Sequence, residues 1–182
     1  MTIKELYKTK IVPDLAKEFG IRNSSAAPKI SSVTLSVGLS HGLKDPKFIE
    51  VAESVLSRIT GQRPVKTKSK QSISNFKIRK GMVVGMRVTL RGKRMWDFLE
   101  KFLHVTFARV RDFRGISTKH VDARGNISIG FREFLPFPEI RPDEVERVHG
   151  IEVTVATTAG DKEKGTALLK AFGFPFAKSN SK

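Results

Sequence analysis

Apolar residues along the first part of the chain follow two different periods, and each period predicts a different element. Between Ile3 and Phe19 they recur at helical spacing, which predicts a helix that ends at Gly20 and is kinked or restarted at Pro13. From residue 30 to residue 37, valine and leucine alternate with serine and threonine. This period of two predicts a strand with one uncovered face.

The middle of the chain carries the clearest boundary signals. Asp45 followed by Pro46 is typical of a helix start, and Gly61 is typical of a helix end, so a helix is predicted between them. The elements predicted next are a short strand over 62–68, a polar loop over 69–80, a strand over 82–91, and a helix over 93–107 that buries Met95, Leu99, Phe102 and Leu103.

The C-terminal part is predicted to hold a turn at 124–126, strands near 127–131 and 151–157, and a helix from about 161 to 172. Amphipathic strands whose apolar faces share one layer of helices indicate the α+β fold class. We expect a single two-layer domain with a mainly antiparallel, curved sheet, helices on one face and an open basic face. This domain is expected to span residues 1–177, followed by a disordered tail over 178–182.

Positive charge is concentrated in one stretch of the chain. Residues 54–96 contain twelve Lys and Arg and no carboxylate, while the whole chain of 182 residues carries a net charge of +16. The rest of the chain holds 22 basic and 18 acidic side chains, so the excess is local. Nucleic acid is the favoured partner, because each neutralised phosphate releases condensed counterions. An anionic membrane surface and a solvated charge run are the alternatives.

Strand alternation places part of this charge on the open face of the predicted sheet. The residues expected there are Thr34, Ser36, Lys66, Lys68, Arg87, Thr89 and Arg91. Hydroxyl and guanidinium groups without bulky aromatic neighbours suit phosphate oxygens and ribose 2′-hydroxyls better than base stacking. The sequence therefore predicts recognition of structured RNA through its shape and backbone.

Other chemistries lack the residues they need. The four histidines have no metal-ligand spacing, cysteine is absent, and no glycine-rich phosphate loop is followed by Lys-Ser or Lys-Thr. A metal-dependent nuclease needs carboxylates beside the bound phosphate, and the basic stretch has none. No apolar run approaches the roughly 18 residues of a membrane span. We expect a protein that is not an enzyme and uses no cofactor, no metal, no small-molecule substrate and no membrane.

Several long motifs show a resemblance to a known family. They are Gly61-Gln-Arg-Pro-Val, Val88-Thr-Leu-Arg-Gly-Lys-Arg-Met-Trp-Asp-Phe-Leu, Arg109-Val-Arg-Asp-Phe-Arg-Gly, Asp122-Ala-Arg-Gly-Asn and Phe137-Pro-Glu-Ile. In this order they closely resemble the large-subunit ribosomal protein five family of the bacterial or organellar branch, the 5S rRNA-binding protein of the central protuberance. The resemblance extends over nearly the whole chain, as far as Gly173-Phe-Pro-Phe.

The resemblance implies that polar residues of the open sheet face contact 5S rRNA in the large subunit, beside the large-subunit rRNA. The matching positions are Ser36, Gln62 and Thr89. Ser36 departs from the pattern, because the bacterial family usually has asparagine there, with a longer reach and both a donor and an acceptor. The residues predicted to bind 5S rRNA are Thr34, Ser36, Gln62, Arg63, Lys66, Lys68, Arg87, Thr89 and Arg91.

The resemblance also implies two further partners. The loop over 69–80 is expected to reach the peptidyl-site tRNA, through Lys70, Ser72, Phe76, Lys77, Arg79 and Lys80. Its apolar residues Ile73 and Phe76 either fold back to close the loop or face outward, and the sequence leaves both open. A basic small-subunit ribosomal protein of the thirteen family is expected across an inter-subunit bridge. The predicted bridge residues are Arg111, Arg114, Glu139, Asp143, Glu144 and Glu146.

The acidic cluster at 139–146 supports the bridge, because RNA repels carboxylates and a basic protein attracts them. The expected location is the cytoplasmic ribosome, with an organellar matrix ribosome as the alternative. The alternative function is a free RNA-binding or RNA-chaperone module outside the ribosome.

Overall fold

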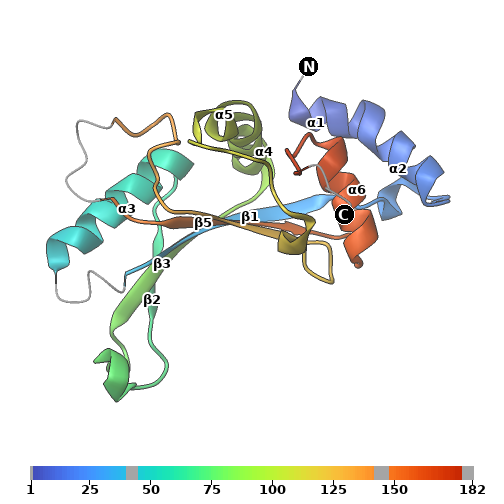
Figure 1. Ribbon diagram of the computed structural model, residues 1–182. Coiled ribbons are helices and arrows are strands. Elements are labelled where there is room, and N and C mark those ends of the chain that lie inside the picture. The colour runs from blue at the N-terminus through green and yellow to red at the C-terminus, as the bar shows by residue number, and fades with distance from the viewer. Residues whose placement is uncertain (1, 40–44, 142–147, 178–182) are drawn as a thin grey trace. The chain divides into compact units, whose positions relative to one another are not determined.

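The computed structural model describes residues 2–39, 45–141 and 148–177 (Figure 1). Five strands form one open antiparallel sheet in the order β2-β3-β1-β5-β4, which confirms the predicted α+β class. The strands are β1 Ile30–Gly38, β2 Val65–Lys68, β3 Val83–Leu90, β4 Ile127–Phe131 and β5 Ile151–Thr157. The predicted tail over 178–182 lies outside the described residues.

The chain divides into two compact units, each assembled from separate segments. Unit 1 comprises residues 1–33, 91–129 and 154–182, and unit 2 comprises residues 34–90 and 130–153. Strands β1, β4 and β5 contribute residues to both units. The single domain over residues 1–177 stays a prediction.

The N-terminal helix of unit 1 is confirmed, with a change of helix type before Pro13. Helix α1 (Ile3–Leu6) begins at Thr2, whose hydroxyl accepts a hydrogen bond from the Glu5 N–H. A π-helical turn over Tyr7–Ile11 joins it to α2 (Val12–Glu18), and the Val12 N–H bonds to the carbonyl of Tyr7. Because proline has no N–H to donate, the wider turn accommodates it without ending the helix.

An aromatic core fills the centre of unit 1. Helix α4 (Gly92–Lys101) continues through a π-helical turn over Phe102–Thr106 into α5 (Phe107–Arg109). The ring of Phe102 lies 5.4 Å from that of Phe98 and 4.6 Å from that of Phe107. The prediction that Leu103 is buried is wrong, since it is only half-buried. The extra residue in the π turn rotates the buried face toward Phe107.

A tight turn in unit 1 packs directly against helix α6 (Lys162–Ala171). One carboxylate oxygen of Asp122 accepts hydrogen bonds from the N–H groups of Arg124 and Asn126, both at 2.8 Å. At Gly125 φ is 83°, and the Gly125 carbonyl accepts a hydrogen bond from the Thr157 hydroxyl at 2.9 Å. Gly165 of α6 lies against the Gly125 backbone with no room for a side chain between them.

In unit 2, helix α3 (Pro46–Thr60) packs against β3. Its predicted boundaries are confirmed: the Asp45 carboxylate accepts a hydrogen bond from the Lys47 N–H, and Gly61 follows the helix in the left-handed conformation. The buried stripe of α3 is Phe48, Ala52, Val55, Leu56 and Ile59. The hairpin formed by β2 and β3 extends away from α3 and carries the loop over 69–80 at its tip (Figure 1).

His149 is a buried titratable group in unit 2. Its ring lies 4.5 Å from the ring of Phe134 and 5.7 Å from the ring of Phe48. Its Nδ1 is 3.2 Å from the carbonyl of Gly150. Burial lowers the pKa of His149 below its ordinary value, because the apolar surroundings disfavour the charged imidazolium.

We expect the free energy of unfolding to fall as the pH drops below about 6.5, the ordinary pKa of histidine. In that range the unfolded chain binds a proton at His149 that the folded protein does not bind, so protons favour unfolding. Urea unfolding midpoints at pH 7.5 and pH 5.5 measure this loss. The His149→Phe variant should show a smaller difference between the two midpoints. An equal difference in both proteins would assign the acid sensitivity to other groups.

Candidate nucleic-acid interface

The pairing of β2 with β3 decides which side chains share a face of the hairpin. Val65 lies opposite Arg87, and Lys66 lies opposite Met86. Directly opposed residues in an antiparallel pair project from the same face. Met86 is buried, with 1% of its surface exposed, and Arg87 is exposed. Val65 and Arg87 therefore project away from the core, while Lys66 lies on the side of α3.

The pairing of β3 with β1 extends the uncovered side. The hydroxyls of Thr34 and Thr89 lie 3.3 Å apart, and the Leu39 N–H donates to the Val84 carbonyl at 3.0 Å. Both contacts fit one antiparallel register, and that register places Ser36 opposite Arg87. The four residues Thr34, Ser36, Arg87 and Thr89 form a contiguous group, called here the open face.

The open face is flat beside its one cation. Gly85 precedes Arg87 by two residues, and a Cβ there would lie 2.9 Å from the Thr67 hydroxyl and 3.0 Å from the Val37 carbonyl. A glycine inside a strand lets another backbone approach closely. Three hydroxyls and a guanidinium on a flat sheet can hydrogen-bond to phosphate oxygens and 2′-hydroxyls of an RNA duplex.

The predicted position of Lys66 on the open face is wrong. Its Nζ lies 2.8 Å from Oε2 of Glu53 on α3, in agreement with the register. Lys68 follows two residues later along β2, so alternation places it off the open face as well. The sequence prediction failed because it put Val65 inward, whereas β2 is an edge strand and leaves Val65 63% exposed.

The other predicted 5S rRNA-binding residues lie around the open face or elsewhere in the chain. The side-chain amide of Gln62 makes a long hydrogen bond of 3.5 Å to the Thr89 carbonyl, which brings it to the end of the open face. Arg63 is exposed, and its Nε donates to Oε1 of Glu53 at 3.2 Å. Arg91 is exposed and belongs to unit 1.

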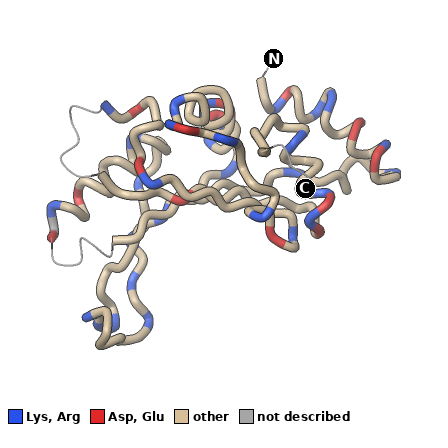
Figure 2. Tube along the Cα trace, viewed as in Figure 1, with Lys and Arg blue, Asp and Glu red and all other residues tan. Residues whose placement is uncertain are grey.

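Glu53 is the residue that sequence reasoning missed. Hydrogen bonds from Lys66 and Arg63 hold the pKa of its carboxyl below the usual value. A signal for it existed, because Glu53 is the last carboxylate before the basic stretch of residues 54–96. Figure 2 shows how Lys and Arg follow the β2–β3 hairpin, which contains no Asp or Glu.

The loop over 69–80 closes on itself through its backbone. Ile73 and Ile78 exchange two hydrogen bonds of 2.9 and 3.1 Å, and the Lys80 N–H donates to the Ser72 hydroxyl at 3.0 Å. Phe76 is 68% exposed, so it faces outward and does not close the loop. The six predicted tRNA-contacting residues, Lys70, Ser72, Phe76, Lys77, Arg79 and Lys80, are all exposed.

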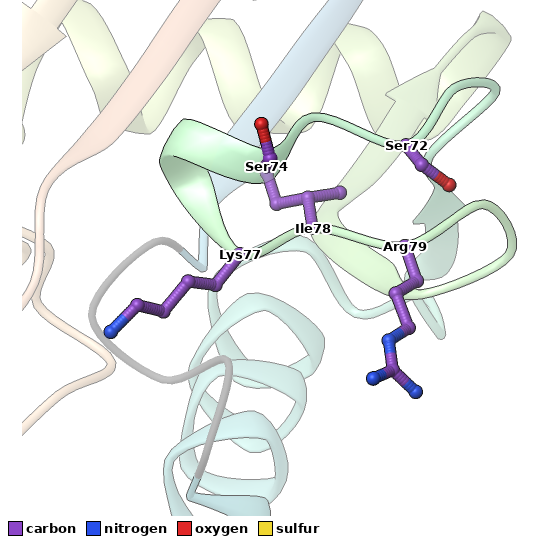
Figure 3. Close-up of a pocket in the computed structure, with 5 residues that line it drawn as sticks. All are labelled: Ser72, Ser74, Lys77, Ile78 and Arg79. Carbon is purple, nitrogen blue, oxygen red and sulfur yellow. The ribbon is translucent and has the colours of Figure 1, made fainter.

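A shallow hollow in this loop is lined by Ser72, Ser74, Lys77, Ile78 and Arg79 (Figure 3). The ammonium of Lys77 and the guanidinium of Arg79 extend to the same side of the loop. Lys77 has a φ of 54°, in the left-handed region, where a non-glycine residue is uncommon. The loop thus presents two cations and an exposed aromatic ring at the tip of the hairpin.

The predicted bridge residues are only partly described. Asp143, Glu144 and Glu146 lie outside the described residues. Glu139 is half-buried, and its backbone carbonyl accepts a hydrogen bond of 2.9 Å from the Arg58 guanidinium of α3. Arg111 and Arg114 are exposed in unit 1. Within the described ranges, no group of His, Asp and Glu could hold a metal ion. None of the described helices is both long and apolar enough to cross a membrane.

Comparison with known proteins agrees with this arrangement. Residues 23–79 match the family described as ribosomal protein L5, and residues 83–176 match the family described as the C-terminus of the same ribosomal protein. The large ribosomal subunit protein uL5 of Colwellia psychrerythraea is 44% identical over 176 residues, which cover 97% of each chain. These matches set aside a free RNA-binding module outside the ribosome. The chain therefore belongs to the ribosomal protein L5 family, as a non-enzymatic, rRNA-associated constituent of the large subunit of the cytoplasmic ribosome.

Proposed function

We propose that the protein binds 5S rRNA through the open face and helps to attach it in the central protuberance of the large subunit. The observation that carries this proposal is the strand register, which sets Thr34, Ser36, Arg87 and Thr89 side by side on the uncovered side of β1 and β3. The resemblance at Ser36, Gln62 and Thr89 supports the choice of 5S rRNA among structured RNAs.

The chemistry of the open face favours an RNA duplex. The minor groove of A-form RNA is wide and shallow and displays 2′-hydroxyls, which threonine and serine hydroxyls can pair with. The planar guanidinium of Arg87 can donate two parallel hydrogen bonds to a phosphate. Gln62 adds an amide at the end of the row, and Arg91 adds a cation from unit 1.

Two finer assignments belong to the same proposal. The loop over 69–80 contacts the peptidyl-site tRNA, which its exposed cations and the exposed ring of Phe76 support. The acidic segment that begins at Glu139 contacts a basic small-subunit protein of the thirteen family, with Arg111 and Arg114 as further bridge residues. Charge supports the acidic contact, because carboxylates attract a basic protein and are repelled by RNA.

Hydroxyl-radical footprinting of 5S rRNA tests the proposed site. The wild-type protein should protect a short run of riboses on both strands of one duplex. The Thr89→Val variant removes one hydroxyl and keeps the β-branched shape, so it should reduce this protection while the protein stays folded. Protection that is unchanged in this variant and also in the Arg87→Ala variant would place the RNA on another surface.

Trimming residues 72–77 is expected to separate the loop from the open face. Binding to 5S rRNA should stay within about threefold, or roughly 0.7 kcal/mol, because the shortened loop leaves Arg87 and Thr89 in place. Retention of tRNA in ribosomes assembled with the trimmed protein should weaken. Filter binding to 5S rRNA and a tRNA retention assay measure the two effects. Loss of 5S rRNA binding on trimming would contradict this division of roles.

A further inference from the structure

Glu53 and the two cations that it binds form a cluster outside the open face. The Glu53 carboxylate accepts Lys66 Nζ at 2.8 Å on one oxygen and Arg63 Nε at 3.2 Å on the other. The Glu53 side chain is 20% exposed, while that of Arg63 is 86% exposed. The carboxylate is thus held between α3 and β2, and one anion is shared by two cations.

The cluster lies at an edge of the sheet. Strand β2 is the last strand in the sheet order, so its outer side has no strand partner within the described fold. Lys66 projects to the side of α3, whereas Arg87 projects from the opposite face. A polyanion drawn to Arg63 and Lys66 would therefore meet the edge of β2 and the side of α3. It would not meet the hydroxyls of the open face.

Binding at this edge would be purely electrostatic, and any RNA could provide it. Each cation that neutralises a phosphate adds affinity that does not depend on sequence. A cation already paired with a carboxylate adds less, because the carboxylate compensates part of its charge and repels the phosphate. With Glu53 in place, the three groups together carry a charge of +1; without it, they would carry +2.

We propose that Glu53 is a specificity-determining residue, because its carboxylate holds Arg63 and Lys66 and so prevents the β2 edge from binding RNA that does not fit the open face. This inference rests on the proposed binding of 5S rRNA. In this view Arg63 and Lys66 are not contacts to 5S rRNA, and Glu53 acts by weakening the competing complexes.

The Glu53→Gln variant tests the proposal in binding assays with 5S rRNA and with an unrelated duplex RNA of equal length. Affinity for the unrelated RNA should rise at least about threefold, and the slope of log affinity against log salt should steepen by up to about 0.7–0.9 for each released cation. Affinity for 5S rRNA should change less than about twofold. Adding Lys66→Met to Glu53→Gln should return most of the affinity for unrelated RNA toward the wild-type value.

Glu50→Gln is the matched control, because it removes the same charge from an exposed position on the same helix. An equal gain in Glu50→Gln would show a net-charge effect and overturn the proposal. A loss of 5S rRNA affinity in Glu53→Gln without a gain for unrelated RNA would overturn it too, because the carboxylate would then support the RNA site. A wild-type protein without preference for 5S rRNA would overturn the proposed function itself. A preference that Glu53→Gln keeps unchanged would overturn only the role of Glu53.

Discussion

Replacing Gly165 with alanine is expected to destabilise unit 1 by about 3 kcal/mol or more, as overpacking does when backbone must move. An added Cβ would lie 2.6 Å from the Gly125 carbonyl oxygen and closer still to the Gly125 Cα. Neither contact can be relieved by turning a side chain. Helix propensity acts in the opposite direction, because alanine is favoured over glycine inside a helix by about 1 kcal/mol. The sign of the change therefore shows which effect is larger.

Urea unfolding measures this difference. Gly130→Ala is the matched control, since no atom lies within 4 Å of the position its Cβ would take. We expect the control to unfold near the wild-type midpoint and Gly165→Ala to unfold at a clearly lower urea concentration. The turn at Gly125 is also held by Asp122, Asn126 and Thr157, so it cannot easily move away from α6. A Gly165→Ala protein at least as stable as wild type would contradict the described packing.

Replacing Arg87 with alanine is expected to reduce the affinity for 5S rRNA by about tenfold or more. A hydrogen bond to a charged group contributes about 1.5–3 kcal/mol, and Arg87 is the cation at the centre of the open face. The slope of log affinity against log salt should become shallower by about 0.7–0.9, because one phosphate contact is lost. Arg87→Lys should recover the slope more fully than the affinity, since lysine keeps the charge and loses the planar fork.

Lys47→Ala is the control for Arg87→Ala, because it removes one exposed cation from α3 and leaves the sheet unchanged. Its affinity for 5S rRNA should stay within about twofold of the wild-type value, as for a cation that contacts no phosphate. If both variants lose the same affinity, binding depends on net charge, and the open face is not the site.

Local signals in the sequence were sufficient for much of the fold. Asp45 and Gly61 marked the ends of α3, because a helix end is decided by a side chain or a backbone conformation within a few residues. The alternation in β1 correctly separated Thr34 and Ser36 from the buried Val33 and Leu35. Both features are encoded over short distances, so the printed residues alone could predict them.

Features that depend on distant segments were not predictable. In β2 the alternation of Val65 and Lys66 suggests that the valine is buried, yet pairing with β3 turns Val65 outward. The lysine is tolerated on the α3 side because Glu53 from another element supplies a carboxylate. The π-helical turn at Phe102–Thr106 likewise adds one residue to a turn, which moves the buried face without changing the apolar pattern enough to be recognised.

The central claim is that the protein recognises 5S rRNA through the open face of its sheet. The most direct test is a competition binding measurement in which the purified protein is offered labelled 5S rRNA with an unrelated duplex RNA of equal length as competitor. It should be repeated at several salt concentrations, because affinities at a single salt concentration do not separate specific from electrostatic binding. We predict that the wild-type protein prefers 5S rRNA at least about tenfold at each salt concentration, and that Arg87→Ala loses most of this preference. Equal affinity for both RNAs, or a preference that Arg87→Ala leaves unchanged, would contradict the claim.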